Sequence, residues 1–212
     1  MNSLARWSNR ILGLLLLLAS VIHAGEVTDL SAIGLEVNQD LPHGFDLEFV
    51  HDLRFINDPS GLHKSISELE LSYNINKYFG LATSYRYSVY PDKYSERGSL
   101  GGSFSLKTGA LAHKLRIKYQ HDVDSDDPAE EYLRSRYSLG YKRIFGVKPF
   151  VYWELYYSLA EDQLSRKRYS FGLDRKLTAN VKAMFYFLSQ TEMNAEDPRS
   201  ARILGGRIQV EL

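Results

Sequence analysis

The sequence predicts an all-β protein that folds as an antiparallel, up-and-down transmembrane β-barrel. Apolar and polar residues alternate at a period of two through most of the chain after residue 24, and no stretch holds a helical period. The alternating segments run about 10 to 13 residues, sufficient for the 9 to 11 that a tilted strand needs to cross a bilayer. Short and longer connections also alternate, as hairpins that span a membrane require.

The N-terminal segment, residues 1–24, is interpreted as a secretory signal peptide. Arg6 and Arg10 supply a basic start, an apolar run follows, and Ala24 before Gly25 offers a small-residue cleavage site. The alternative is a membrane-anchor helix, but the run is shorter than the roughly 20 apolar residues that span a bilayer. Residues 25–212 are therefore expected to form one outer-membrane β-barrel domain.

Each expected strand places apolar or aromatic side chains on one face and charged or small side chains on the other. In the third segment, Leu69, Leu71 and Tyr73 alternate with Glu70 and Ser72. Because successive side chains of a strand point to opposite faces, this pattern predicts a sheet with one apolar side. The alternating segments are, in chain order, 33–38, 45–55, 69–75, 79–89, 103–107, 114–120, 134–142, 151–158, 169–173, 181–187 and 204–212.

Two kinds of connection join these segments, and each kind is expected at its own end of the barrel. The tight ones are 41–44, 76–77, 108–110, 144–146 and 178–180. The longer polar ones are 57–63, 91–95, 123–130, 160–164 and 191–199. In outer-membrane barrels the tight turns face the periplasm and the long loops face outward.

The number of strands is expected to lie between 10 and 12, with 12 preferred. An open sheet edge in hydrocarbon would leave backbone groups unpaired, so the sheet should close on itself. Single-chain bacterial barrels have even strand numbers, whereas the sequence shows eleven segments. Either a short strand is hidden, or one segment does not span.

Charge and cysteine content exclude several classes of function. Without Arg6 and Arg10, the chain carries 24 basic and 26 acidic residues, which gives no reason to expect a nucleic-acid partner. The absence of cysteine excludes a disulfide framework, a thiolate metal site and a lipidated cysteine.

Several strands also resemble a known family. The resemblance lies in Tyr85-Arg86-Tyr87 and in the ranges 134–141, 149–155, 169–190 and 204–212. In these segments the chain is similar to a bacterial family of small outer-membrane-like β-barrel proteins known only as a domain of unknown function. The resemblance implies a barrel in the outer membrane of a Gram-negative bacterium, and it lends neither an activity nor catalytic residues. In size and strand style the chain also resembles, to a lesser degree, the acid-oligosaccharide porins.

The polar face of the strands is expected to line the lumen with charges of both signs. The preferred interpretation is a structural or loop-binding barrel whose lumen is salt-bridged and largely filled. The alternative is a narrow, porin-like channel for small anionic solutes, with a basic wall on two neighbouring strands opposite an acidic wall that also includes Asp46. The predicted lumen-lining residues are Lys114, Arg116, Lys118, Arg134, Arg136, Glu48, Glu68, Glu70, Arg86, Glu154 and Arg168.

No enzyme, metal site or cofactor is expected. His121 and Ser135, on adjacent segments, are the pair closest to a hydrolytic arrangement, but scattered His and Ser residues produce one such pair by chance. Asp124, Asp126 and Asp127 form an acidic loop tip, which is more often solvated than metal-binding.

Aromatic residues on the apolar face are expected to form girdles at the two membrane interfaces. The candidates near short turns are Tyr73, Phe79, Tyr141 and Trp153, and those nearer the long loops are Tyr87, Tyr119, Tyr137 and Tyr157. The expected partners are outer-membrane lipid and the barrel-assembly machinery. The final residue, Leu212, departs from the aromatic ending that many such barrels have.

Overall fold

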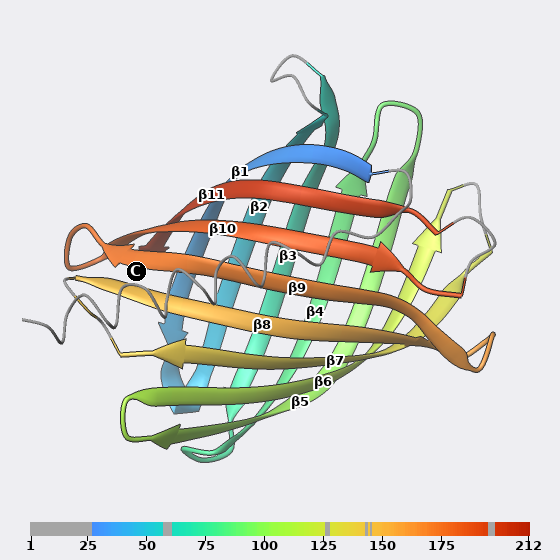
Figure 1. Ribbon diagram of the computed structural model, residues 1–212. Coiled ribbons are helices and arrows are strands. Elements are labelled where there is room, and N and C mark those ends of the chain that lie inside the picture. The colour runs from blue at the N-terminus through green and yellow to red at the C-terminus, as the bar shows by residue number, and fades with distance from the viewer. Residues whose placement is uncertain (1–26, 57–60, 126–127, 143, 145, 195–197) are drawn as a thin grey trace, which may run out of the picture.

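A computed structural model describes residues 27–56, 61–125, 128–142, 144, 146–194 and 198–212 of the chain. The described residues form eleven strands that close into one barrel (Figure 1). The signal peptide predicted at residues 1–24 lies outside the described residues. The strands are β1 (Val27–Leu41), β2 (Phe45–Ile56), β3 (Leu62–Asn74), β4 (Phe79–Val89), β5 (Tyr94–Thr108), β6 (Leu111–Asp124), β7 (Glu130–Tyr141), β8 (Val147–Ser158), β9 (Gln163–Lys176), β10 (Val181–Glu192) and β11 (Ser200–Glu211).

The barrel closes through a parallel pair. Each strand is antiparallel to the next along the chain, and β1 then pairs with β11 in parallel, from Val27 opposite Ser200 to Asn38 opposite Glu211. The preference for 12 strands was therefore wrong for the described residues, and the sheet is not antiparallel throughout. An odd number of alternating strands makes the first and last run the same way. A parallel ladder still pairs the backbone groups at that edge.

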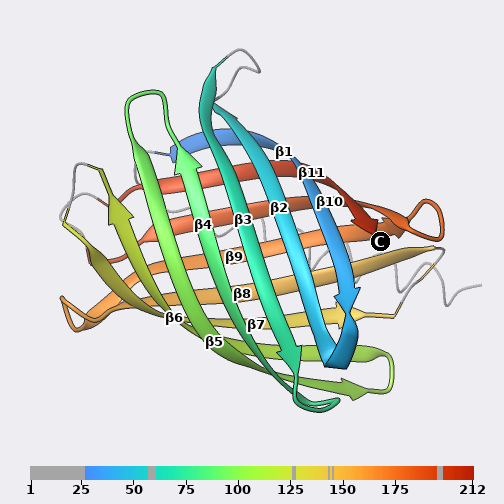
Figure 2. The same ribbon diagram turned by 180° about the vertical axis from the view of Figure 1, so that it is seen from behind.

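The strands are strongly tilted around the barrel axis. Followed once around the sheet, the register that starts at Leu41 of β1 returns to β1 at Val27, 14 residues away. This stagger corresponds to a tilt of about 40° and a backbone radius of about 11 Å. Figures 1 and 2 show the consequence, since β2 to β5 on one wall cross β8 to β11 on the other wall obliquely. A barrel of this size leaves an interior that side chains must line or fill.

The two predicted sets of connections do lie at opposite ends of the strands. Of the described residues, the tight-turn end carries 42–44, 75–78, 109–110, 142, 144, 146 and 177–180, and the long-loop end carries 61, 90–93, 125, 128–129, 159–162, 193–194 and 198–199. The first tight turn is a 3-10 helix, η1 (Pro42–Gly44). Gly109 and Gly146 have φ of 60° and 82°, a left-handed conformation that glycine adopts without a steric penalty.

The two faces of the sheet have the opposite polarity to that of a water-soluble protein. The outer face exposes large apolar side chains, among them Leu204 at 69%, Phe185 at 65% and Leu100 at 63%. Inside the barrel, Gln120 and Glu154 are 0% and 1% exposed. An apolar exterior around a polar interior is the arrangement of a barrel surrounded by lipid. Among the described residues, none belongs to a helix that is apolar and long enough to span a membrane.

Candidate functional site in the barrel lumen

A cavity of about 910 Å³ occupies the part of the lumen nearest the tight-turn end. Lys77 and Tyr78 of one tight turn line it, as do Lys107, His113 and Lys148, which lie within a few residues of other tight turns. None of the described loop residues of the long-loop end lines it, and the lining residue nearest that end is Arg54, two residues before the end of β2. The cavity therefore reaches the turns of the tight-turn end, and among the described residues it does not reach the loops of the other end.

Packed polar side chains fill the lumen nearer the long-loop end. We call Gln120, Tyr132, Arg134, Glu154 and Tyr156 the long-loop layer. All five are between 0% and 6% exposed. They come from three consecutive strands, β6, β7 and β8, whose register places Gln120 opposite Tyr132 and Arg134 opposite Tyr156. The layer separates the cavity from the long-loop side of these strands.

Glu154 is the anionic centre of this layer. Its Oε1 accepts hydrogen bonds from Nε of Arg134 at 2.7 Å and Nε of Arg136 at 2.6 Å. Its Oε2 accepts from Nη1 of Arg168 at 3.3 Å and from the hydroxyl of Tyr156 at 3.1 Å. One buried carboxylate thus neutralises part of the charge of three arginines from β7 and β9. Without it, removing the three guanidinium groups from water would carry a large free-energy cost.

Several acidic side chains of β1 to β3 are also held by basic partners, among them Glu36, Asp52, Glu68 and Glu70. Glu70 accepts from Nζ of Lys118 at 2.7 Å, although β4 and β5 lie between their strands. Gly101 of β5 faces Lys118 in the register, and a Cβ there would come closer than 3.0 Å to that residue. The missing side chain therefore allows Lys118 to lie across β5 and reach Glu70.

Two arginines, Arg207 and Arg86, make three further ion pairs with acidic side chains of β1 to β3. Arg207 of β11 donates to Glu36 at 3.0 Å and to Asp52 at 2.7 Å. Arg86 donates through Nε to Glu68 at 2.9 Å. Such charge-assisted hydrogen bonds between strands hold the side chains in fixed places along the lumen wall.

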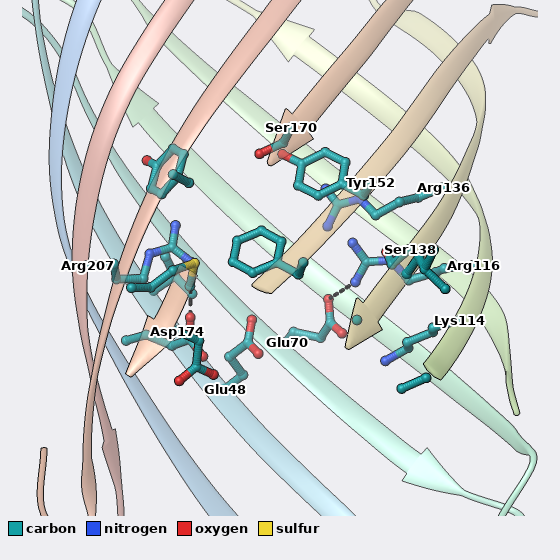
Figure 3. A pocket seen from close by; sticks show the side chains of 18 of the residues that line it. Glu48, Glu70, Lys114, Arg116, Arg136, Ser138, Tyr152, Ser170, Asp174 and Arg207 are labelled. Carbon is teal, nitrogen blue, oxygen red and sulfur yellow. Dashed lines mark hydrogen bonds and ion pairs between the residues drawn. The ribbon is translucent and has the colours of Figure 1, made fainter. Parts of the chain in front are cut away.

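Basic groups outnumber acidic groups around the cavity. Eleven of the lining residues are Arg or Lys and six are Asp or Glu. The basic members are Arg54, Lys77, Arg86, Lys107, Lys114, Arg116, Arg134, Arg136, Lys148, Arg168 and Arg207. Figure 3 shows Lys114, Arg116 and Arg136 on one side of the cavity, with Glu48, Asp174 and Arg207 on the other.

Arg116 is the least satisfied guanidinium of this basic side. It forms one ion pair, from Nη1 to Glu70 at 3.6 Å, and no hydrogen bond to any side chain in the described parts of the chain. The register of β6 and β7 places Arg116 directly opposite Arg136. Like charges directly opposite each other on neighbouring strands destabilise a sheet. An anion bound between Arg116 and Arg136 would reduce this repulsion.

The eleven predicted lumen residues lie on the inside of the barrel. Two of them are buried behind the cavity wall, and nine line the cavity itself. Lys118 and Glu154 are buried beneath the cavity wall, at 2% and 1% exposed. The other nine line the cavity: Glu48, Glu68, Glu70, Arg86, Lys114, Arg116, Arg134, Arg136 and Arg168. Asp46, assigned to the acidic wall, does not line it and instead accepts from Asn74 at 2.7 Å.

The predicted set omitted an aromatic part of the wall, formed by Phe150, Tyr152 and Tyr186. The signal for the first two was present, because alternation along β8 puts Phe150 and Tyr152 on the same face as Glu154. Tyr186 was hidden, since it stands between Phe185 and Phe187 in a run that is apolar on both faces.

The aromatic residues proposed for the membrane girdles lie on the outer face at varying exposure. Phe79 is 51% exposed, Tyr119 42%, Tyr87 40%, and Tyr73, Tyr137 and Trp153 are each 38% exposed, while Tyr141 and Tyr157 are less exposed. The assignment of Tyr137 and Trp153 to opposite girdles was wrong. They face each other in the register, and their rings stack at 5.9 Å. Residues that lie opposite each other on two consecutive strands have a similar height in the barrel, so the two rings belong to one end.

The side chains considered for other chemistry are not brought together. His121 faces Glu131 and Ser135 faces Ile117, so His121 and Ser135 are four register positions apart. Asp124 accepts from Lys93 at 3.2 Å, and Asp126 and Asp127 lie outside the described residues. The described residues contain no group of three or more His, Cys, Asp or Glu arranged to hold a metal ion.

Comparison with known proteins relates the chain to one family and to porin-like folds. The family model "Protein of unknown function (DUF2490)" matches residues 33–201. No curated protein sequence matches the chain. The NanC porin structure is similar at a TM-score of 0.53 and 12% identity, over 84% of this chain and 91% of that one.

Two further solved structures are similar with lower scores. The KdgM porin has a TM-score of 0.49 and 14% identity, over 82% of this chain and 87% of that one. A bacterial polysaccharide outer membrane secretin has a TM-score of 0.49 and 7% identity over 76% of this chain, which spans only 62% of the secretin chain. The likeness to the NanC porin shows a shared barrel fold.

Proposed function

The chain belongs to the DUF2490 family of proteins of unknown function, and from this premise we propose that it is a porin-like outer-membrane barrel that admits small anionic solutes to a basic lumen. The supporting observation is the cavity of about 910 Å³ whose lining carries eleven basic and six acidic residues. Charge of one sign on the low-dielectric walls of a cavity concentrates oppositely charged solutes there.

Location in the outer membrane is part of the proposal. The apolar exterior of the strands supports contact with lipid, and the polar interior supports a hydrated lumen. In this proposal residues 1–24 direct export, the barrel-assembly machinery inserts the chain, and the exposed aromatic residues anchor it at the interfaces. The tight-turn end then faces the periplasm, so the cavity is approached from that side.

The second candidate function is a non-conducting structural or loop-binding barrel. The long-loop layer favours it, because Gln120, Glu154 and Tyr156 are at most 1% exposed and leave little room for a solute to pass. In the first proposal this layer is the constriction that keeps conductance small. In the second it is a permanent plug.

Single-channel recording of the refolded chain 25–212 in a planar bilayer tests the proposal. The expected result for the wild-type protein is small, discrete openings that select anions in a salt gradient. Arg116→Glu is expected to shift the reversal potential towards cation selectivity, since Arg116 lines the cavity and has one weak ion pair. The matched control is Arg175→Glu, which makes the same charge change at an exposed residue that does not line the cavity.

Each outcome distinguishes the two candidate functions. Silence from a barrel that is folded by circular dichroism and by heat-modifiable gel migration would support the plugged structural barrel. Openings that select cations, or that shift equally in Arg116→Glu and Arg175→Glu, would contradict a basic lumen as the cause of selectivity.

A further inference from the structure

The aromatic part of the cavity wall supplies a second kind of recognition. The register places Phe150 opposite Gly172, Gly172 opposite Tyr186, and Tyr186 opposite Gly205. Aromatic residues and glycines therefore alternate along one row that crosses β8 to β11. Phe150, Tyr152 and Tyr186 all line the cavity, and we call them the aromatic wall.

Two rings of the aromatic wall lie along the sheet rather than across the lumen. A Cβ built on Gly172 would come closer than 3.0 Å to ring atoms of Phe150, and one built on Gly205 closer than 3.0 Å to ring atoms of Tyr186. Each ring thus covers a glycine of a neighbouring strand, and its other side borders the cavity. Such rings offer flat apolar surface on which another ring can stack.

The basic side of the cavity adjoins this wall. The guanidinium of Arg136 lies 4.5 Å from the ring centroid of Tyr152, and Figure 3 shows the two side by side. Arg116 faces Arg136 on the next strand, and among the described residues it has one ion pair and no hydrogen bond to a side chain. Guanidinium groups bind carboxylates with two parallel hydrogen bonds, so this pair offers a place for one carboxylate.

We propose that the cavity binds cyclic organic carboxylates, with the ring against the aromatic wall and the carboxylate on Arg116 and Arg136. This inference rests on the proposed function and names the solute class of the same lumen. The volume of about 910 Å³ lies within the range of small-molecule sites and accommodates a single-ring acid with water. A few polar anchors combined with apolar surface are typical of such sites.

Binding of three probes to the refolded chain 25–212 in detergent, measured by isothermal titration calorimetry, tests this inference. Benzoate has both ring and charge, acetate has the charge without the ring, and benzamide has the ring without the charge. Benzoate is expected to bind roughly tenfold more tightly than either, because stacking and ion pairing then act together.

Variants separate the two halves of the site. Tyr186→Leu and Phe150→Leu each remove a ring and are expected to weaken benzoate binding severalfold while leaving acetate unchanged. Arg116→Gln is expected to weaken benzoate and acetate and to leave benzamide unchanged. The control is Tyr169→Leu, which removes a ring from the outer face, where Tyr169 is 37% exposed.

The outcomes separate this inference from the proposed function. Equal affinity for benzoate and acetate in a barrel that selects anions would overturn the ring site and leave the anion channel intact. A second contradicting result is that Tyr169→Leu abolishes the tighter binding of benzoate over acetate, while Tyr186→Leu and Phe150→Leu retain it. The ring of benzoate would then bind outside the lumen, and the inference would be wrong.

Discussion

Replacing Glu154 by glutamine should destabilise the barrel more than the same change at Glu48, Glu68 or Glu70. Glu154 is 1% exposed and accepts hydrogen bonds from Arg134, Arg136 and Arg168 at 2.7, 2.6 and 3.3 Å. The amide keeps the shape of the side chain and removes its charge. Three guanidinium groups are then left at close range with no anion between them.

The expected cost is about 3 to 5 kcal/mol of unfolding free energy, the range found when one partner of a buried ion pair is removed. The matched control is Glu211→Gln, because the carboxylate of Glu211 pairs among the described residues with Lys182 alone, and its side chain is 42% exposed. Water screens an exposed pair, so Glu211→Gln should change stability far less than Glu154→Gln does.

Equilibrium unfolding in guanidinium chloride, with the barrel in lipid vesicles, measures both values. A second substitution, Arg136→Gln in the Glu154→Gln background, should recover part of the loss, since one of the three competing cations is gone. A loss for Glu154→Gln comparable with that of Glu211→Gln would refute the assignment of Glu154 as the anionic centre of the long-loop layer.

Two other predictions test the aromatic wall and the orientation of the barrel. Gly205→Ala should cost about 1 to 3 kcal/mol of stability because the new methyl group meets the ring of Tyr186, whereas Gly98→Ala, with no atom within 4 Å, should be nearly neutral. Adding Tyr186→Leu to Gly205→Ala should recover most of the loss, and purely additive unfolding free energies would contradict the contact. Because the chain has no cysteine, Glu161→Cys and Lys77→Cys each create a single thiol, at the long-loop and tight-turn ends respectively. In intact cells a membrane-impermeant maleimide should label Glu161→Cys but not Lys77→Cys, and the reverse pattern would show that the cavity faces outward.

Much of the fold could be predicted from the sequence because the signals are local. The direction of a side chain along a strand has a period of two, so the alternation of Leu69, Leu71 and Tyr73 with Glu70 and Ser72 already separates the outer from the inner face. Turn positions follow from the same pattern, since a tight turn interrupts it briefly and a long loop interrupts it for longer. These features need no knowledge of the neighbouring strands.

The expected range of 10 to 12 strands includes the observed eleven, but the preference for 12 was wrong, because an even number is a regularity of known barrels rather than a requirement of backbone chemistry. Closure requires only that the two edges pair, and the parallel ladder from Val27 opposite Ser200 to Asn38 opposite Glu211 does this. All eleven alternating segments in the sequence correspond to strands of the described structure.

The sequence by itself thus determined the class of fold, the two ends of the barrel and the charged character of its interior. Only the tertiary structure decided that Glu154 forms ion pairs with three arginines, that Lys118 reaches across two strands to Glu70, and that the cavity lies nearest the tight-turn end. These features depend on the stagger between strands, which sets the height of each residue along the axis. That stagger is a property of the closed sheet, to which every strand contributes, so no local pattern encodes it.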